Sequence, residues 1–307
     1  MPTRSMALVD AFTTDPLSGN AAGVIPDADG LSAEQCQAIA RELAVSETAF
    51  VLPSESADRR LRFFTPTQEV DLCGHATIAA HASLHEEGRL DTGSHSLETA
   101  VGSLQIEIDA DGTVWMTQET PTVEQRTVDY DRLAAALGTE ASTLRDVGAD
   151  VPVARASTGL PVLVVPINFL EALGGLQPDF GAIEALSAEF DVAGIYVFTF
   201  DTLSADATAH GRFFAPKVGV DEDPVTGTAS GACAAYFHAA GATAFDGPPA
   251  ELVFEQGDFL DRPGRVQARV DTDHRGSTRV RVGGQAVTTV EGSITVPDDE
   301  ADDIIEV

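Results

Sequence analysis

The sequence is almost without lysine and is poor in basic residues generally. Lys217 is its single lysine, and 18 basic residues stand against 49 acidic ones, which gives a net charge of −31. A surface of this charge repels nucleic acids and anionic membranes, so neither is expected as a partner. Because the acids are spread along the chain, they do not indicate one cation-binding patch.

The excess of acid predicts adaptation to a high-salt cytosol. At about 1 M salt the Debye length falls to ~3 Å, so repulsion among surface carboxylates is largely screened. We therefore expect the midpoint of thermal unfolding to rise as KCl is increased toward the molar range, which calorimetry would measure. A midpoint that is highest at low salt would contradict this interpretation.

Cysteine is scarce, and long apolar runs are missing. Cys36, Cys73 and Cys233 are an odd number at wide spacings, so they cannot form a fully paired disulfide framework, and they include no CxxC pair. No apolar run approaches the ~20 residues that cross a bilayer, and the first residues lack the apolar core of a signal peptide. These absences favour a cytoplasmic protein with reduced thiols.

Motifs of the large cofactor-dependent and hydrolytic families are missing too. There is no GxGxxG after a strand, no P-loop and no GxSxG elbow, which argues against dehydrogenases, NTPases and serine hydrolases. His81 and His85 lie one helical turn apart, but no third ligand follows at a useful spacing, so a solvated or packed helix face is favoured over zinc. We expect neither a metal nor a cofactor.

What the sequence does contain is an internal repeat across its 307 residues. Arg62–Pro66 (RFFTP) leads to Cys73–Ala76 (CGHA). Arg212–Pro216 (RFFAP) leads to Thr226–Ala229 (TGTA), with three extra residues before Thr226. The extra residues fall in the stretch that holds Glu222-Asp223-Pro224. An insertion in one copy of a repeat is easier to explain by a functional site than by packing.

The repeat predicts two similar α+β domains. The expected hairpin strands are Glu47 to Leu52 with Leu61 to Phe64, and Ile195 to Phe200 with Arg212 to Phe214. An Ala-rich helix that starts at a glycine follows each hairpin.

A further helix is expected over Ser32 to Leu43, where Ser32 and Gln35 form a capping box and Leu31 reaches Cys36. We place the domain boundary between Thr120 and Asp150, with residues 1–125 in one domain and 126–307 in the other. The chain end is expected to pack back on the first domain.

The two repeat helices begin at Gly74 and Gly227, each followed by a polar residue. A helix start exposes unpaired N–H groups and the positive end of the helix dipole, which together favour an anion. If the halves pack about a pseudo-twofold axis, both starts would converge on one cleft that binds a small carboxylate. For a single start, a glycine that merely relieves crowding is the better explanation; two matched copies favour the site.

These segments resemble the signature blocks of the PhzF-like phenazine-biosynthesis family. The blocks span positions 10 to 263, and the two that contain Gly74 and Gly227 are the most specific. They are Asp10-Ala11-Phe12 with Gly19-Asn20, Ser46-Glu47-Thr48-Ala49-Phe50, Phe64-Thr65-Pro66, Glu69 to Thr77, Glu222 to Gly227, and a weaker Gln256-Gly257 with Arg262-Pro263.

The resemblance implies a fold and an activity. The fold is that of diaminopimelate epimerase, in which each of two domains wraps a curved, mostly antiparallel sheet round a central helix, and family members are typically homodimers. The best-known member isomerises a dihydro-hydroxyanthranilate by moving a proton between ring carbons without a cofactor. By analogy, Glu47 would transfer the proton. His75 and Asp223 would assist it, and Asn20, Gly74, Gly227 and Thr228 would bind the substrate.

Physical chemistry is compatible with these roles. A carboxylate is an efficient proton shuttle at neutral pH when burial or a second carboxylate raises its pKa. Asp223 facing Glu47 across the cleft would let the two groups share one proton. An isolated glutamate is more often a salt-bridged strand residue, but the segment after Glu47 has the pattern of a buried strand. Asp223 alone would be a turn residue before Pro224, and His75 alone could equally donate to a substrate oxygen or satisfy backbone groups at the helix start.

Cys73 leaves one alternative open. Two-base epimerases and racemases of this fold use one thiol from each domain, whereas here Thr226 replaces the second thiol. Cys73 is therefore expected to pack at a helix start, with a one-thiol, one-carboxylate mechanism as the variant. The competing functions are an amino-acid epimerase or racemase, which loss of activity in Cys73→Ser would support, and a non-catalytic binder of a small carboxylate.

Overall fold

The computed structural model describes residues 2–147, 151–240, 251–272 and 276–298. Its contacts divide the chain into two compact units. The first unit holds the chain up to Leu17, then Ala21–Val114, and the segment from Gln285 onward; the second holds Ser18–Asn20 and Trp115–Gly284. The division thus falls after Val114, earlier than the boundary expected from the sequence, because β8 pairs with β17 of the second unit.

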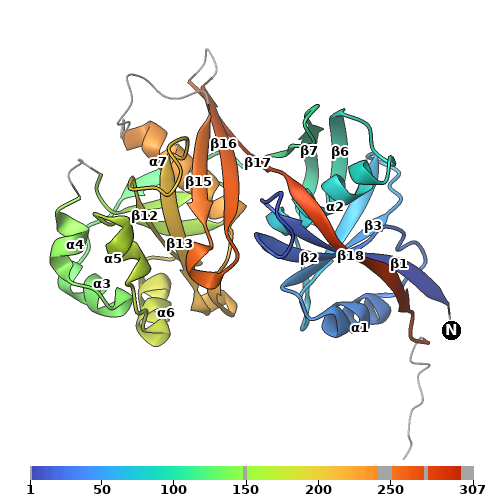
Figure 1. Ribbon diagram of the computed structural model, residues 1–307, viewed down its shortest axis with the longest axis horizontal. Coiled ribbons are helices and arrows are strands. Elements are labelled where there is room, and N and C mark those ends of the chain that lie inside the picture. The colour runs from blue at the N-terminus through green and yellow to red at the C-terminus, as the bar shows by residue number, and fades with distance from the viewer. Residues whose placement is uncertain (1, 148–150, 241–250, 273–275, 299–307) are drawn as a thin grey trace, which may run out of the picture. The chain divides into compact units, whose positions relative to one another are not determined.

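The first unit is a mixed sheet wrapped round one helix (Figure 1). Strand β1 pairs with β18 and β2, and β2–β3 and β4–β6 are parallel, whereas β1–β18, β3–β4, β4–β5 and β6–β7 are antiparallel. The β1–β18 pair returns Ala286–Thr295 to the first unit, and the residues after 298 lie outside the described part of the chain. The strands are β1 (Thr3–Ala11), β2 (Asn20–Ile25), β3 (Glu47–Leu52), β4 (Arg59–Phe64), β5 (Glu69–Val70), β6 (Gly93–Thr99), β7 (Gly102–Ile108) and β18 (Ala286–Thr295).

Helix α2 (Gly74–Glu86) is the centre of this unit. Every residue from Ala76 to Leu84 is buried, and the helix contacts β1, β3 and β18. A helix that is buried all round carries no amphipathic stripe, and small side chains let the strands approach it closely, which explains its alanine content. Helix α1 (Ala33–Leu43) covers the outside against β3 and β4, with the Ser32–Gln35 capping box that the sequence predicts.

His81 lies fully buried in α2 and makes stability depend on pH. Its Nδ1 donates to Thr77 O at 2.8 Å, and burial lowers its pKa from 6.5 to about 4. The folded state therefore holds His81 neutral, while the unfolded chain takes up a proton below pH 6.5. This contribution to stability is complete above pH 6.5 and is lost as the pH falls toward 4, by roughly 3 kcal/mol in total.

We therefore expect His81→Gln to flatten the loss of unfolding free energy between pH 6.5 and 4, measured by urea denaturation at each pH. His85, one turn further along, is the control, since its ring is only partly buried and bonds Leu90 O at 2.8 Å. An unchanged pH slope in His81→Gln would contradict the assignment.

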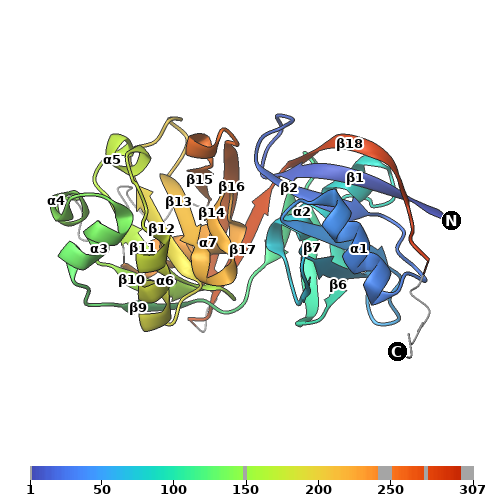
Figure 2. The same cartoon turned by 90° about the horizontal axis from the view of Figure 1, so that it is seen from below.

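The second unit repeats the arrangement round helix α7 (Gly227–Ala240), which is buried from Ala229 to Phe237 and contacts β9, β10, β11, β16 and β17 (Figure 2). Here β11–β12 and β13–β15 are parallel, and β9–β10, β10–β11, β12–β13, β13–β14, β15–β16 and β16–β17 are antiparallel. The strands are β8 (Val114–Thr117), β9 (Thr122–Gln125), β10 (Ala154–Ser157), β11 (Pro161–Pro166), β12 (Gly194–Thr199), β13 (Ala209–Ala215), β14 (Val220–Asp223), β15 (Leu252–Gln256), β16 (Gly264–Thr272) and β17 (Thr278–Gly284).

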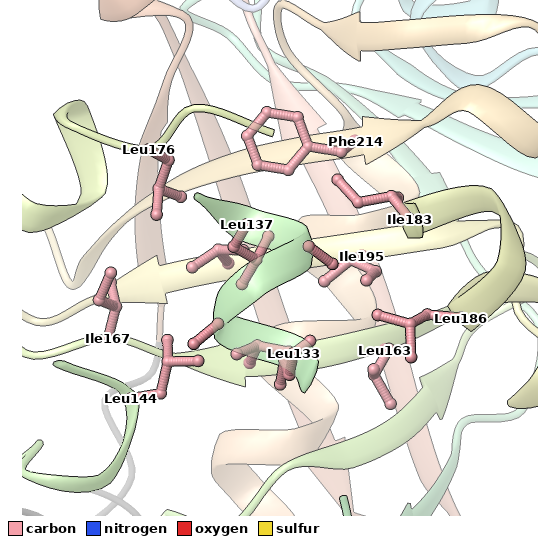
Figure 3. Close-up of a cluster of buried hydrophobic side chains, with 14 of the residues drawn as sticks. Leu133, Leu137, Leu144, Leu163, Ile167, Leu176, Ile183, Leu186, Ile195 and Phe214 are labelled. Atoms are coloured by element: carbon pink, nitrogen blue, oxygen red, sulfur yellow. The ribbon is translucent and has the colours of Figure 1, made fainter. Parts of the chain in front are cut away.

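An outer layer of helices covers the other face of this sheet: α3 (Tyr130–Leu137), α4 (Ala141–Arg145), α5 (Leu170–Gly174) and α6 (Phe180–Glu189). Their side chains form one buried cluster with β11, β12 and β13 (Figure 3). Leu133, Leu137 and Ile183 pack there against Ile195 and Phe214. None of the sequence motifs predicted this layer.

The predicted hairpins and helices are present, with β4 and β13 starting earlier than expected. The order of parallel and antiparallel pairs through β2-β3-β4-β6-β7 recurs through β11-β12-β13-β15-β16. The extra residues of the second copy lie between Pro216 and Glu222, in the stretch that starts with a 3₁₀ turn (Pro216–Val218). Strand β14 is the counterpart of β5, since Asp223 pairs with Phe213 as Val70 pairs with Phe63. The interpretation of Asp223 as part of the insertion is therefore wrong. Among the described residues, no helix is long and apolar enough to cross a membrane.

Candidate active site

Three of the predicted site residues meet in the first unit, where β3 begins and α2 begins. Glu47 is the first residue of β3, paired with Ala22 of β2. Cys73 is the N-cap of α2, and His75 is the second residue of the helix. The helix start therefore presents a thiol and an imidazole to the end of a strand that carries a carboxylate.

The distances within this cluster are short enough for direct interaction. His75 Nε2 lies 3.4 Å from Glu47 Oε2 and 3.3 Å from Ser46 Oγ. Cys73 Sγ lies 3.5 Å from His75 Nδ1. The side chains of His75 and Glu47 are 10% and 20% exposed, so the cluster is largely buried but reaches the surface.

One tautomer satisfies these contacts together. A neutral His75 that carries its proton on Nε2 donates to the Glu47 carboxylate, and its Nδ1 accepts from the Cys73 thiol. The imidazole then fixes the direction of the Glu47 carboxylate. Cys73 does not cap α2 through its side chain, and Thr77 Oγ1 donates to its carbonyl at 2.7 Å.

A second cluster surrounds Asp223 in the second unit. Asn20 Nδ2 donates to Asp223 Oδ1 at 2.8 Å and to Val225 O at 2.9 Å. Thr226 Oγ1 donates to Asp223 Oδ2. Gln256 Nε2 donates to Asp223 O at 2.8 Å, and its Oε1 accepts from Thr226 N at 3.2 Å. Asn20 and Gln256 are buried, so they hold the aspartate in one orientation just before α7.

The chain near Asp223 is shaped by a glycine and an arginine. Gly257 has φ +93°, and a Cβ there would lie 2.2 Å from Arg262 O and 2.8 Å from Pro224 O, so only glycine fits. Arg262 donates through Nη2 to Ser18 O at 2.6 Å and through Nε to Gly19 O at 2.9 Å, which fixes the segment that carries Asn20.

The repeat shows that the two clusters are not chemically equivalent. Thr48 pairs with Phe64 and Ile195 pairs with Phe214, so the counterpart of Glu47 is Gly194. A Cβ at Gly194 would lie 2.3 Å from Phe214 O, which excludes any side chain at this position. The second unit therefore has Gly194 where the first has Glu47, and Thr226 where the first has Cys73, and the carboxylate of its cluster is that of Asp223.

Comparison with known proteins identifies the family of the chain. The family model for phenazine biosynthesis-like protein, PhzC-PhzF, matches residues 9–292. An uncharacterized isomerase of Bacillus subtilis, YfhB, is 38% identical over 91% of this chain and 94% of its own length. The trans-2,3-dihydro-3-hydroxyanthranilate isomerase of Pseudomonas chlororaphis is 35% identical over 94% of this chain and 98% of its own. The chain belongs to the PhzF-like family.

Solved structures agree with this assignment. A PhzF-family protein of Bacillus anthracis is 34% identical and superposes with a TM-score of 0.88 over 96% of this chain and 100% of its own. A hydroxyproline epimerase of Agrobacterium vitis, 15% identical with a TM-score of 0.58, shares the fold. The PhzF-like chain is therefore an isomerase with the epimerase-like fold that the resemblance implied.

Within this PhzF-like isomerase, the structure brings together Glu47, Cys73 and His75 in one unit, and Asn20 and Asp223 in the other. Gly74 and Gly227 begin the two buried helices, and Thr228 follows Gly227, with its carbonyl accepting from Thr158 Oγ1 at 3.3 Å.

Sequence reasoning assigned no role to Ser46, Thr226 or Gln256, although each lies in one of the family blocks. Their position inside these blocks was the available signal. Their contacts with His75 and Asp223 depend on long-range packing, which no local pattern reveals.

Proposed function

We propose that this isomerase moves a proton between two carbons of a small carboxylate substrate, with Glu47 as the acid and base. The observation that carries the proposal is the position of Glu47: it is 20% exposed, oriented by His75 at 3.4 Å, and stands beside a helix start. The N–H groups of the first turn of α2 have no partner within the helix, and they suit a carboxylate or a developing enolate oxygen.

In this proposal Glu47 removes a proton from an acidic C–H bond, and the electron pair moves into conjugation with the substrate carboxylate. The same glutamic acid then returns the proton to another carbon, so the reaction needs no redox partner. Asp223, held by Asn20, Thr226 and Gln256, is the second candidate carboxylate, as an acceptor for a substrate hydroxyl or as an acid. The relative from Pseudomonas chlororaphis makes a dihydro-hydroxyanthranilate the first substrate to try.

The asymmetry of the clusters favours this reaction over a symmetric racemisation. A two-thiol mechanism lacks its second thiol, and Gly194 excludes a second strand carboxylate. The alternative is an epimerase with a one-thiol, one-carboxylate mechanism, which loss of activity in Cys73→Ser would support. A non-catalytic carboxylate binder has no evident use for the contact between His75 and Glu47.

The test is proton exchange at carbon. The protein is incubated in D₂O at high salt with cyclic and amino carboxylates, and NMR follows deuterium incorporation. Exchange that is lost in Glu47→Gln supports the proposal, and exchange that survives assigns the base to Asp223 or Cys73. If Glu47→Gln binds a carboxylate as well as the parent protein and neither catalyses exchange, the chain is a binder.

A further inference from the structure

We propose that Glu47, Cys73 and His75 also form a site for a thiophilic divalent cation such as Zn²⁺, which would block the isomerisation rather than perform it. Among the described residues these three are a group whose ligand atoms all lie within 4.8 Å of one another. Thiolate, imidazole and carboxylate are the protein ligands that zinc takes. No motif of metal-ligand spacing joins these residues, because Glu47 precedes the other two by about two dozen positions in the chain.

The interatomic distances are close to those of a zinc site. With ordinary Zn–N, Zn–O and Zn–S lengths, a tetrahedral ion holds nitrogen and oxygen ligands about 3.4 Å apart, and nitrogen and sulfur ligands about 3.6 Å apart. His75 Nε2 lies 3.4 Å from Glu47 Oε2 and 4.0 Å from Cys73 Sγ. The sulfur lies nearer to His75 Nδ1, at 3.5 Å, so binding of one ion on Nε2 requires the Cys73 side chain to turn from Nδ1 toward Nε2.

The surroundings favour binding by this group and leave a position open. The positive end of the α2 dipole stabilises negative charge on a group at the helix start, where Cys73 stands. Thiolate and carboxylate together neutralise a divalent ion. Since the Glu47 side chain is 20% exposed, water can fill the fourth position, as in zinc sites that keep three protein ligands.

The other two thiols do not compete. Burial raises the pKa of Cys36 to about 11 and also raises the pKa of Cys233, which is fully buried in α7. Because the thiolate is the metal ligand, these two groups stay protonated and inert.

Cation binding itself is independent of the proposed function. Only the predicted inhibition rests on the proposed function, since the ion would occupy Glu47 and His75.

The experiment is a Co²⁺ titration of the EDTA-treated, reduced protein, followed by the thiolate-to-cobalt charge-transfer band in the near-ultraviolet. We expect a saturable band at one equivalent, displaced by Zn²⁺, with one proton released from the thiol. Cys73→Ala should abolish the band, and Cys36→Ala should keep it. Glu47→Gln should weaken binding by more than the ~10–100-fold that loss of a second-shell partner costs.

Circular dichroism and the unfolding midpoint establish that each variant is folded, and Cys73→Ser serves as the second variant if Cys73→Ala does not fold. A band that persists without Cys73, or the absence of saturable binding in the parent protein, would overturn the cation site. Neither result bears on carbon–proton exchange, so failure of the cation site is distinct from failure of the proposed function.

Discussion

Glu47→Gln is expected to lower turnover on a substrate that the parent protein isomerises by roughly 10³-fold, with KM changed far less. Loss of a general acid or base typically costs 10²–10⁴-fold, and a glutamine of the same shape keeps the contact with His75 but carries no exchangeable carboxyl proton. A fall in kcat without a matching rise in KM would locate the effect in the transition state. The measurement is steady-state kinetics combined with deuterium incorporation.

Glu69→Gln is the control for this variant. Glu69 belongs to the same unit, in β5, but its side chain is 44% exposed and pairs with Arg62, outside the cluster of Glu47. Turnover should stay within about twofold of the parent in Glu69→Gln. Equal losses in the two variants would point to a general electrostatic effect of removing negative charge, and would remove Glu47 from its catalytic role.

Local signals explain which parts of the fold the sequence could predict. The capping box of α1 depends on Ser32 and Gln35 alone, so it is readable from four consecutive residues, and the structure has it. The buried helices α2 and α7 are marked by their glycine starts and alanine content. The repeat extended each of these predictions to the other half of the chain.

The parts that could not be predicted depend on long-range pairing. The division of the chain after Val114 results from β8 pairing with β17, more than half the chain apart in sequence. The hydrogen bond from Gln256 to Asp223 O, and that from Asn20 to Asp223 Oδ1, likewise join distant segments. The packing of the sheet brings these segments together, so composition and periodicity cannot predict these hydrogen bonds.

Each copy of the repeat contains an equivalent Arg–Glu ion pair, more exposed in the first copy than in the second. Arg62 donates to Glu69 through Nε and Nη2 at 2.7 and 2.8 Å, and Arg212 donates to Glu222 with the same atoms at the same distances. The guanidinium lies over Phe64 at 5.0 Å in one copy and over Phe214 at 4.9 Å in the other. The copies differ in exposure, since the side chains are 19% and 44% exposed in the first pair but 8% and 12% in the second.

Glu222→Gln is therefore expected to cost about 3–5 kcal/mol of unfolding free energy, and Glu69→Gln less than about 1 kcal/mol. Removing the charge of Glu222 leaves the buried Arg212 guanidinium with the carbonyls of Leu173 and Leu176 as its other acceptors. In the exposed copy, water replaces the lost partner. Urea denaturation of both variants under one salt condition measures the difference.

A double variant separates the stability that the ion pair contributes from the destabilisation caused by a buried charge without its partner. Arg212→Met combined with Glu222→Leu should recover most of the stability that Glu222→Gln loses, because apolar side chains of similar volume need no partner. Glu222 directly precedes Asp223 in β14, so the recovered double variant also reports whether the ion pair positions Asp223. Normal turnover with restored stability would show that Asn20, Thr226 and Gln256 suffice to hold the aspartate. A loss from Glu222→Gln no larger than that from Glu69→Gln would show that burial does not distinguish the two pairs.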